Sequence, residues 1–558
     1  MSVTGNNDDE GSLEQPWLTV QFGLDQLEPG DILSILAGTY NEKVILDVSG
    51  SEGNPITIRN YESDVAILDG SGLTDQEAMI EIIDQSYIVI EGLTITNNEM
   101  NDAQGILIEN ECRDITIRNN KISNINFSSN ASDEVNENRN SQPLIIYGTH
   151  PSNAITNLII DNNEIFDSRT GYSEALAING NVDGFEVTNN QVHDIANIGI
   201  DIIGHEGTSS DPQTDQARNG LVKGNTIYNC IAAYATSGGI YVDGGKNVLI
   251  ENNISYHNGY GIEIGCENVG KTAENLTVRN NFFYDNEVTG IAVGGFEFPS
   301  GSGKVVGAIF TNNTLFKNDF LQDFTGELFL TYCENCSFEN NIFYINDQNV
   351  FAFAELEQPG LQMDYNLIFA PDGSDEVEYD WNGEGYTGFS EFQSETGLDA
   401  NSLFADPEFL NASLPDPDLH IGSGSPAIDA GNPTFTAVAG ETDIDGGERV
   451  KTGRVDIGAD EFGEDDGTVV TAVPESILQD RMIIFPNPTN GPLQLEISED
   501  LLFTSMELVI LNVIGEVVLV EPMTKNFMDL SNLPPGLYLL RVSLDKNRAA
   551  KIFKIIKQ

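Results

Sequence analysis

Basic residues and cysteines are scarce in this chain of 558 residues. Lysine and arginine together number 25 against 88 aspartates and glutamates, which leaves a formal net charge of −63. A field this negative repels phosphate and anionic lipid, so nucleic acid and anionic membranes are poor partners, and we expect no nucleic acid to bind. The five cysteines are too few, and odd in number, for a disulfide scaffold. We expect them to be small buried apolar residues.

Long apolar runs are also missing. No segment approaches the roughly 20 apolar residues needed to cross a bilayer, so no membrane span is predicted. The first residues, MSVTGNNDDEGSLEQ, are polar and lack the apolar core of a signal peptide. We expect residues 1–16 to be disordered, and the signal peptide of an exported protein to have been removed from this sequence. Hydrophobic residues still make up 40% of the chain, which predicts a globular protein of at least two domains.

A short repeat recurs along the chain: an apolar or β-branched residue, any residue, then Asn-Asn. The copies are ITNN (95–98), IRNN (117–120), IDNN (160–163), VTNN (187–190), IENN (250–253), VRNN (278–281), FTNN (310–313) and FENN (338–341), with VKGN (222–225) as a degenerate copy. From 250 onward they lie 28, 32 and 28 residues apart. Periods of about 20–50 residues indicate stacked units that bury their apolar faces against one another. We expect the asparagines to hydrogen-bond along the stack at one corner.

Each unit is predicted to contain three short strands separated by turns, without sustained helical periodicity. This pattern is typical of a right-handed parallel β-helix, and we assign residues 17–462 to it as the catalytic domain. Val20, Leu24 and Leu27 lie at helical spacing before a Pro-Gly stop, which predicts an N-terminal capping helix. Residues 463–481 are polar and acidic, as in a linker. Residues 482–558 alternate strands with Gly/Pro turns and predict a small β-sandwich, so the fold class is all-β.

Two parts of the chain resemble known families. FPNPTNG, LPPGLYLLRV and the lysine-rich last strand of residues 482–558 resemble, in order, the C-terminal sorting domain of the type IX secretion system of Bacteroidetes. That resemblance implies export, release or attachment at the cell surface, and the secretion machinery as a partner. EPGDILSILAGTYNE and SPAIDAG…DIGADE are similar to the opening and closing segments of right-handed β-helix proteins that act on extracellular polysaccharides. This second resemblance implies architecture and habitat, and it does not name a reaction.

One run of strands carries acids on its outward side. The strands are ALAING (175–180), GIDIIG (199–204), GIYVDGG (239–245), GIEIGCE (261–267) and GIAVGG (290–295). Because side chains alternate across a strand, the outward column is predicted to contain Asp201, Tyr241 and Glu263 between two alanines. Further outward positions add Asp243, His205 and Glu267. Loops 205–220 and 266–276 are expected to wall this patch and to contribute Arg218 and Lys271.

Stacked carboxylates raise at least one pKa, and glycoside hydrolysis uses such a pair. One carboxylic acid protonates the leaving oxygen, and a second activates water or attacks the sugar. Asp201 and Glu263 are expected two strands apart, roughly 9–10 Å between backbones, which favours inversion. Asp243 between them is predicted to orient water, so these three acids are the predicted catalytic residues. Tyr241 is expected to stack on a sugar or to donate a hydrogen bond.

A second chemistry fits the same patch. The carboxylates would hold Ca²⁺ through oxygen ligands, and the ion would neutralise a uronate while Lys271 or Arg218 removes the C5 proton in a β-elimination. The predicted substrate-binding residues are Tyr241, His205, Glu267, Arg218, Lys271 and Tyr172. A third hypothesis is a non-catalytic glycan-binding protein or adhesin, which would not depend on the three acids as a set.

We therefore predict a secreted or cell-surface glycoside hydrolase that degrades extracellular polysaccharide, with an algal glycan suggested by the acidity of the chain. A Ca²⁺-dependent polysaccharide lyase is the alternative, and Ca²⁺ is the only cofactor considered. The protein is expected to be a monomer whose partners are the polysaccharide and the secretion machinery.

Overall fold

A computed structural model describes residues 1–463, apart from 75, 297 and 452, and parts of 482–557. The chain forms two compact units. One comprises Met1–Ile444 with Glu448–Glu464, and the other comprises Asp445–Gly447 with Asp465–Gln558. The acidic linker predicted over 463–481 lies outside the described residues from position 464 onward.

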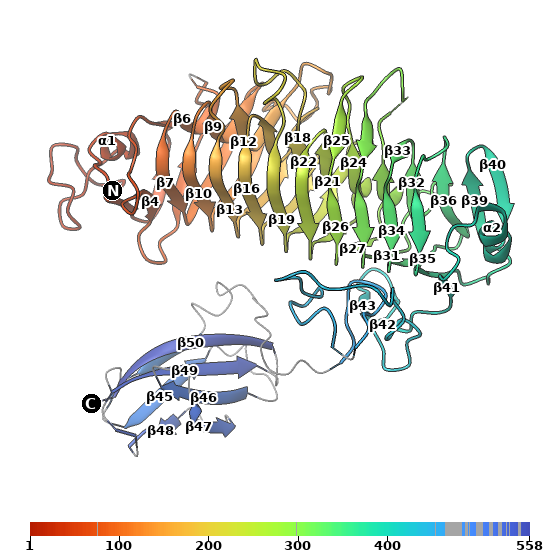
Figure 1. Cartoon of the computed structure of the whole chain (residues 1–558). Helices are drawn as coiled ribbons and strands as arrows, with labels where there is room; N and C mark the ends of the chain where they lie inside the picture. The colour runs from red at the N-terminus through yellow and green to blue at the C-terminus, as the bar shows by residue number, and fades with distance from the viewer. Residues whose placement is uncertain are drawn as a thin grey trace. The chain divides into compact units, whose positions relative to one another are not determined.

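The first unit is a solenoid of three parallel sheets (Figure 1). Each circuit of the chain adds one strand to each sheet. The first sheet contains β1 (Ile32–Ile35), β4 (Ile56–Asn60), β7 (Ser86–Glu91), β10 (Arg113–Arg118), β13 (Thr156–Asp161), β16 (Asp183–Thr188), β19 (Arg218–Lys223), β22 (Lys246–Glu251), β26 (Thr277–Arg279), β30 (Ile309–Thr311), β34 (Ser337–Glu339) and β37 (Gln362–Asp364), with β25 (Thr272–Glu274), β29 (Lys304–Val306) and β33 (Cys333–Glu334) beside it.

The second sheet contains β2 (Gly38–Tyr40), β5 (Ala66–Asp69), β8 (Leu93–Glu99), β11 (Lys121–Asn126), β14 (Glu164–Ser168), β17 (Gln191–Ile195), β20 (Thr226–Cys230), β23 (Ile254–Tyr256), β27 (Phe282–Tyr284), β31 (Thr314–Phe316), β35 (Ile342–Tyr344), β38 (Leu367–Phe369) and β41 (Leu403–Phe404). The third sheet contains β3 (Val44–Leu46), β6 (Ala78–Ile83), β9 (Ala103–Glu109), β12 (Ser141–Gly148), β15 (Leu176–Gly180), β18 (Ile200–Ile203), β21 (Gly238–Asp243), β24 (Tyr260–Gly265), β28 (Thr289–Val293), β32 (Leu328–Leu330), β36 (Val350–Ala354), β39 (Glu378–Trp381) and β40 (Glu384–Thr387). The predicted parallel β-helix is confirmed.

Both ends of the solenoid are covered by a short helix (Figure 1). α1 (Val20–Leu24) buries Val20 and Leu24 at the N-terminal end, which confirms the capping helix, and α2 (Phe389–Thr396) buries Phe389 and Phe392 at the other end. The expected disorder of residues 1–16 was wrong. Met1 is buried, and its ammonium group donates a hydrogen bond to the carbonyl of Ser34, because these residues complete the apolar contacts of the first turn.

The repeated asparagines form a continuous hydrogen-bonded ladder inside the corner between the first and second sheets. In each step one side-chain amide donates to the next side-chain carbonyl at 2.9–3.1 Å. The ladder runs through Asn120, Asn163, Asn190, Asn225, Asn253, Asn281, Asn313, Asn341 and Asn366. The predicted stacking of asparagines is confirmed.

Backbone conformation explains the first residue of each Asn-Asn pair. Asn252 and its equivalents have φ near +55°, a left-handed region that asparagine and glycine enter most readily. Gly224 takes this place with φ +67° in the degenerate copy VKGN. The ITNN copy at 95–98 was assigned wrongly, because Asn98 lies within β8 and donates to the carbonyls of Glu77 and Gln104 instead.

Residues after β41 fold back along the outside of the second sheet. They include the hairpin of β42 (Phe409–Asn411) and β43 (Asp418–Ile421). Leu419 and Ala459 pack on Phe282 and Phe316 of the solenoid. All five cysteines are buried and free, as predicted for small apolar residues.

The second unit contains two antiparallel sheets, as the predicted β-sandwich requires. One contains β44 (Met482–Phe485), β45 (Pro492–Ile497) and β48 (Phe527–Asp529). The other contains β46 (Met506–Asn512), β47 (Val517–Pro522), β49 (Gly536–Leu544) and β50 (Arg548–Lys557).

Candidate functional site

The outward column of the third sheet has the predicted register. Strand pairing aligns Ala177, Asp201, Tyr241, Glu263 and Ala292 across β15, β18, β21, β24 and β28. The backbones of Asp201 and Glu263 are separated by two strand spacings, which is roughly 9–10 Å. Three consecutive turns therefore present two acids and a tyrosine on one face.

Hydrogen bonds connect the acids at the ends of these strands. The backbone amide of Glu267 donates to Oδ1 of Asp243 at 2.6 Å, and the hydroxyl of Tyr241 donates to Oε1 of Glu267 at 3.4 Å. Tyr241 is buried, and a Cβ at Gly265 would lie 3.1 Å from its hydroxyl. Glycine at 265 therefore makes room for the phenol ring.

Asp201 has the most unusual environment of the predicted acids. Its side chain is 3% exposed, and its Oδ1 is a buried oxygen without a hydrogen-bond partner in the described part of the chain. Burial raises the pKa of Asp201 well above its usual value, and charge repulsion adds to this effect from Glu174, Asp243, Glu267 and Glu206. Both effects favour the protonated form of this carboxyl.

Two further acids belong to this patch and were not predicted. Burial, followed by the charges of Glu206 and Glu267, raises the pKa of Glu174 to about 8. Glu206 accepts a hydrogen bond from the amide of Asn179 at 3.4 Å. One carboxylate oxygen from each of Glu206, Asp243 and Glu267 lies within 4.8 Å of the others. We refer to Asp201, Glu263, Glu174, Glu206, Asp243, Glu267 and Tyr241 together as the acidic patch.

His205 and Lys271 lie at the edge of the patch, in the two loops expected to wall it. Nε2 of His205 is 3.3 Å from the carbonyl of Thr272, and burial lowers the pKa of this imidazole. Lys271 precedes Thr272 in the chain, so the loops that carry His205 and Lys271 meet at this contact. The predicted contact of Lys271 with substrate stays a prediction.

The structure contradicts the placement of Arg218 in the patch. Arg218 begins β19 in the first sheet, where its guanidinium pairs with Asp183 at 3.1 Å and donates to Asn181 at 3.0 Å. Because these partners use its donors, its role is structural. Tyr172 is 44% exposed, and its ring packs 5.1 Å from that of Tyr234. Its predicted contact with substrate stays a prediction.

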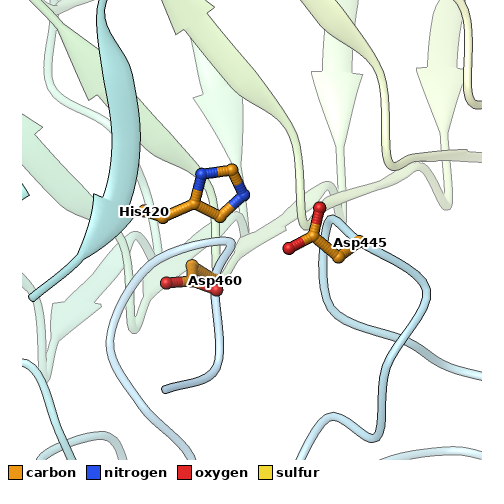
Figure 2. Close-up of side chains that lie close together, drawn as sticks. All are labelled: His420, Asp445 and Asp460. Carbon is orange, nitrogen blue, oxygen red and sulfur yellow. The ribbon is translucent and has the colours of Figure 1, made fainter. Parts of the chain in front are cut away.

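A second group of possible metal ligands is present in the described residues. Figure 2 shows the side chains of His420, Asp445 and Asp460 close together. Their ligand atoms lie within 4.8 Å of one another. The ring of His420 also packs 5.7 Å from that of Phe282 in the second sheet. This group therefore lies away from the third sheet and has no part in the acidic patch.

Fold and patch together define a β-helix protein with an acidic outward site and a separate C-terminal β-domain. Residues 1–293 match the family described as "Pel9A-like, right handed beta helix region", and residues 213–380 match "Right handed beta helix region". The chain belongs to this Pel9A-like right-handed β-helix family. Residues 483–558 match "Secretion system C-terminal sorting domain", which marks the chain for export as predicted.

Individual relatives cover different shares of the chain. "Uncharacterized protein YwoF" of Bacillus subtilis (strain 168) is 32% identical over 443 residues, which are 76% of this chain and 91% of that protein. "Pectate lyase PEL9" of Emericella nidulans is 27% identical over 97 residues, which are 16% of this chain and 24% of that protein. The crystal structure of pectate lyase Pel9A matches with a TM-score of 0.45 and 16% identity, covering 83% of this chain and 96% of that one.

Helices in the described part of the chain are all too short or too polar to pass through a bilayer, in agreement with the sequence.

Proposed function

We propose that this protein is an exported polysaccharide lyase, which cleaves a uronate-containing glycan at the acidic patch with Ca²⁺ bound by Glu206, Asp243 and Glu267. The observation that carries the proposal is the approach of these three carboxylates within 4.8 Å. Among the ion pairs of the described residues, none uses any of the three. Facing carboxylates repel each other, and a cation is the partner that would stabilise them.

The donor set suits calcium. All three ligands are carboxylate oxygens, which Ca²⁺ prefers, and the hydrogen bond from Glu267 to Asp243 holds one of them in place. Burial and the charge of Glu267 raise the pKa values of Asp243 and Glu206, and a bound cation would favour their charged forms. When bound, calcium would neutralise the carboxylate of a uronate and make its C5 proton more acidic.

The remaining steps belong to side chains of this protein. Lys271, acting as a neutral amine, is the proposed base that takes up the C5 proton, because Arg218 is held by Asp183 and the loop of Lys271 contacts His205 through the carbonyl of Thr272. Asp201, kept protonated by burial, would donate a proton to the departing glycosidic oxygen. Membership of the Pel9A-like family and the match to a fungal pectate lyase support a uronate as substrate.

A glycoside hydrolase is the second candidate, favoured by the separation of Asp201 and Glu263. Burial raises the pKa values of both well above the usual range, so either can serve as the acid. A backbone separation of roughly 9–10 Å is compatible with the distance of about 6.5–9.5 Å between the carboxyls of inverting enzymes. Asp243 would orient the attacking water in that reaction.

One assay separates these reactions. The purified full chain is incubated with polygalacturonate, alginate, a sulfated algal glycan and a neutral glycan, with Ca²⁺ and with a chelator. A lyase produces ultraviolet absorbance from unsaturated uronate that disappears with the chelator. New reducing ends without that absorbance would replace the lyase by the hydrolase. Binding without any cleavage would leave a glycan-binding adhesin.

A further inference from the structure

The outward column that contains Asp201 and Glu263 continues beyond the acids as aromatic residues. Strand pairing aligns Glu263 with Ala292, then Phe329, then Phe353. The two phenylalanines are half-buried and their ring centroids lie 5.5 Å apart, whereas Leu328 points into the core. The third sheet therefore presents two aromatic rings to the outside, directly after the acidic patch.

Three more rings lie at the edge of this column. The loop after β28 contains Phe296, whose side chain is 81% exposed, and Phe298, which stacks at 4.0 Å and 10° on Tyr332 of the following turn. Gly294 fixes the turn, because it has φ +118° and a Cβ there would lie 2.5 Å from the backbone nitrogen of Tyr332. The loop is thus built to lie against the next turn and to leave Phe296 in solvent.

The opposite side of the patch is apolar and lacks aromatic rings in the column itself. Toward the N-terminus the same column contains Ala177, Ile145 and Leu107, which are 0%, 1% and 7% exposed and form an outer apolar cluster with Ile203 and Tyr147. Toward the C-terminus the column contains Phe329 and Phe353, which are only half-buried. The partly exposed aromatic rings of the column therefore lie on the C-terminal side of the acids.

We propose that Phe296, Phe298, Phe329, Tyr332 and Phe353 form an aromatic arm that binds the part of the polysaccharide chain extending from the acidic patch along the solenoid. The proposal rests on the proposed function and adds the direction of the chain and the chemistry that holds it. Consecutive turns lie about 4.8 Å apart, so each turn can contact a further part of an extended polymer. Aromatic side chains supply apolar contact area for the C–H faces of sugar rings.

Charge explains why this arm is aromatic. With a net charge of −63, the protein repels an anionic polymer, and basic side chains near the arm are scarce. Lys304, on a neighbouring turn, is paired with Glu334 at 2.8 Å. Stacking does not depend on charge, so it can hold a uronate polymer at salt concentrations that screen the repulsion.

The test measures polymer binding separately from cleavage. Dissociation constants for polygalacturonate and for a neutral arabinoxylan are measured with the full chain by affinity electrophoresis, at low and high salt. Phe296→Ala and Phe329→Ala are compared with Leu410→Ala, which removes a side chain of 64% exposure in β42. Each phenylalanine variant is expected to raise the dissociation constant of a bound polymer about tenfold, and the control should not. Thermal denaturation checks folding, and Phe296→Ala removes a side chain with few contacts to lose.

Each outcome decides something. Weaker binding in both phenylalanine variants supports the arm, even if no polymer is cleaved, in which case the proposed lyase reaction fails alone. Cleavage by the wild type with unchanged affinity in both variants overturns the arm and leaves the reaction standing. Absence of binding to either polymer by the wild type overturns the arm as well. So would a wild-type dimer in sedimentation that Phe296→Ala dissociates, because a second copy would then cover these rings.

Discussion

The backbone amide of Glu267 donates a 2.6 Å hydrogen bond to Oδ1 of Asp243, and it joins the ends of two neighbouring turns. Asp243 is the last residue of β21, and Glu267 follows β24. The bond fixes one oxygen of a buried carboxyl beside the carboxylates of Glu206 and Glu267. A fixed ligand needs less ordering when a cation binds, so this contact would favour the proposed binding of calcium.

Calcium should stabilise the wild-type protein, and Asp243→Asn should remove most of that effect. A ligand that binds only the folded state stabilises it by about 2.7 kcal/mol at one hundred times its dissociation constant. Without calcium the variant should be as stable as the wild type or more so, because it removes one of several repelling charges. The melting temperature of the first unit with and without Ca²⁺ measures both effects.

Glu164→Gln is the matched control for this experiment. Glu164 pairs with Lys121 at 2.6 Å on the surface of the second sheet and has no contact with the patch. Its calcium response should equal that of the wild type. An equal response of Asp243→Asn would show that calcium binds elsewhere.

Asp201→Asn and Glu263→Gln should distinguish the two reactions. Loss of a general acid costs about 10²–10⁴-fold in kcat, so Asp201→Asn should fall by this amount in either reaction. Glu263→Gln should fall as far in a hydrolase and much less in a lyase. Asp201→Asn is expected to lose little stability at pH 7, because burial favours the uncharged form of this carboxyl. A large loss of stability would mean that Asp201 is ionised in the folded protein.

The solenoid could be predicted because one physical requirement recurs in each turn. A buried asparagine must give its amide to the next turn, and the residue before it must take a left-handed conformation. Both requirements can be recognised in the sequence as the residue pairs Asn-Asn or Gly-Asn. The motif alone does not show whether its second asparagine lies at a corner or within a strand. For this reason Asn98 was placed at the corner, although it lies within β8. The order of residues 1–16 could not be predicted, because it depends on contacts such as that of Met1 with Ser34.

The site could be predicted only where strands are regular. Alternation placed Asp201, Tyr241 and Glu263 correctly, since strand pairing maintains their register. The rule of alternating side chains failed after β18, because His205 has φ +73° and the backbone turns at this residue. The turn brings the side chain of Glu206 to the patch. Arg218 was assigned to a loop, whereas it begins β19. The only feature of the sequence that pointed to Glu206 was its position next to His205, which was itself predicted to lie in the patch.

Asn253→Ala should destabilise the solenoid strongly. The amide of Asn253 donates to Asn281 at 3.0 Å and to the carbonyl of Val222 at 2.9 Å, and its carbonyl accepts from Asn225. Alanine would leave several buried polar groups without partners, each costing about 1–3 kcal/mol. Urea denaturation should show a loss of about 2–5 kcal/mol. The exposed Lys121→Ala should lose less than about 1 kcal/mol, and a comparably small loss for Asn253→Ala would mean that the ladder adds little stability.

Glu327 should make the solenoid less stable as the pH rises. It is buried at the end of a second stack of asparagines, which runs through Asn258, Asn286 and Asn318. The oxygens of Glu327 accept from the backbone amide of Asn318 at 2.9 Å and from the side-chain amide of Asn318 at 2.6 Å. Burial raises its pKa from 4.5 to about 8 in the folded state. Between these values the folded protein retains a proton that the unfolded chain has lost, so the contribution of Glu327 is largest below about pH 4.5 and declines toward pH 8.

Glu327→Gln should remove this part of the pH dependence. For a single group the slope is at most about 1.4 kcal/mol per pH unit, so the difference in unfolding free energy between the two proteins should change steadily from pH 5 to pH 8. Urea denaturation at four pH values measures that difference, with Glu52→Gln at an exposed position as a control whose difference from the wild type should stay nearly constant. Parallel curves for the wild type and Glu327→Gln would contradict the prediction, because Glu327 would then titrate alike in the folded and unfolded chains. The amide of glutamine can still accept from Asn318 at one position, so the variant should fold and the comparison remains decisive.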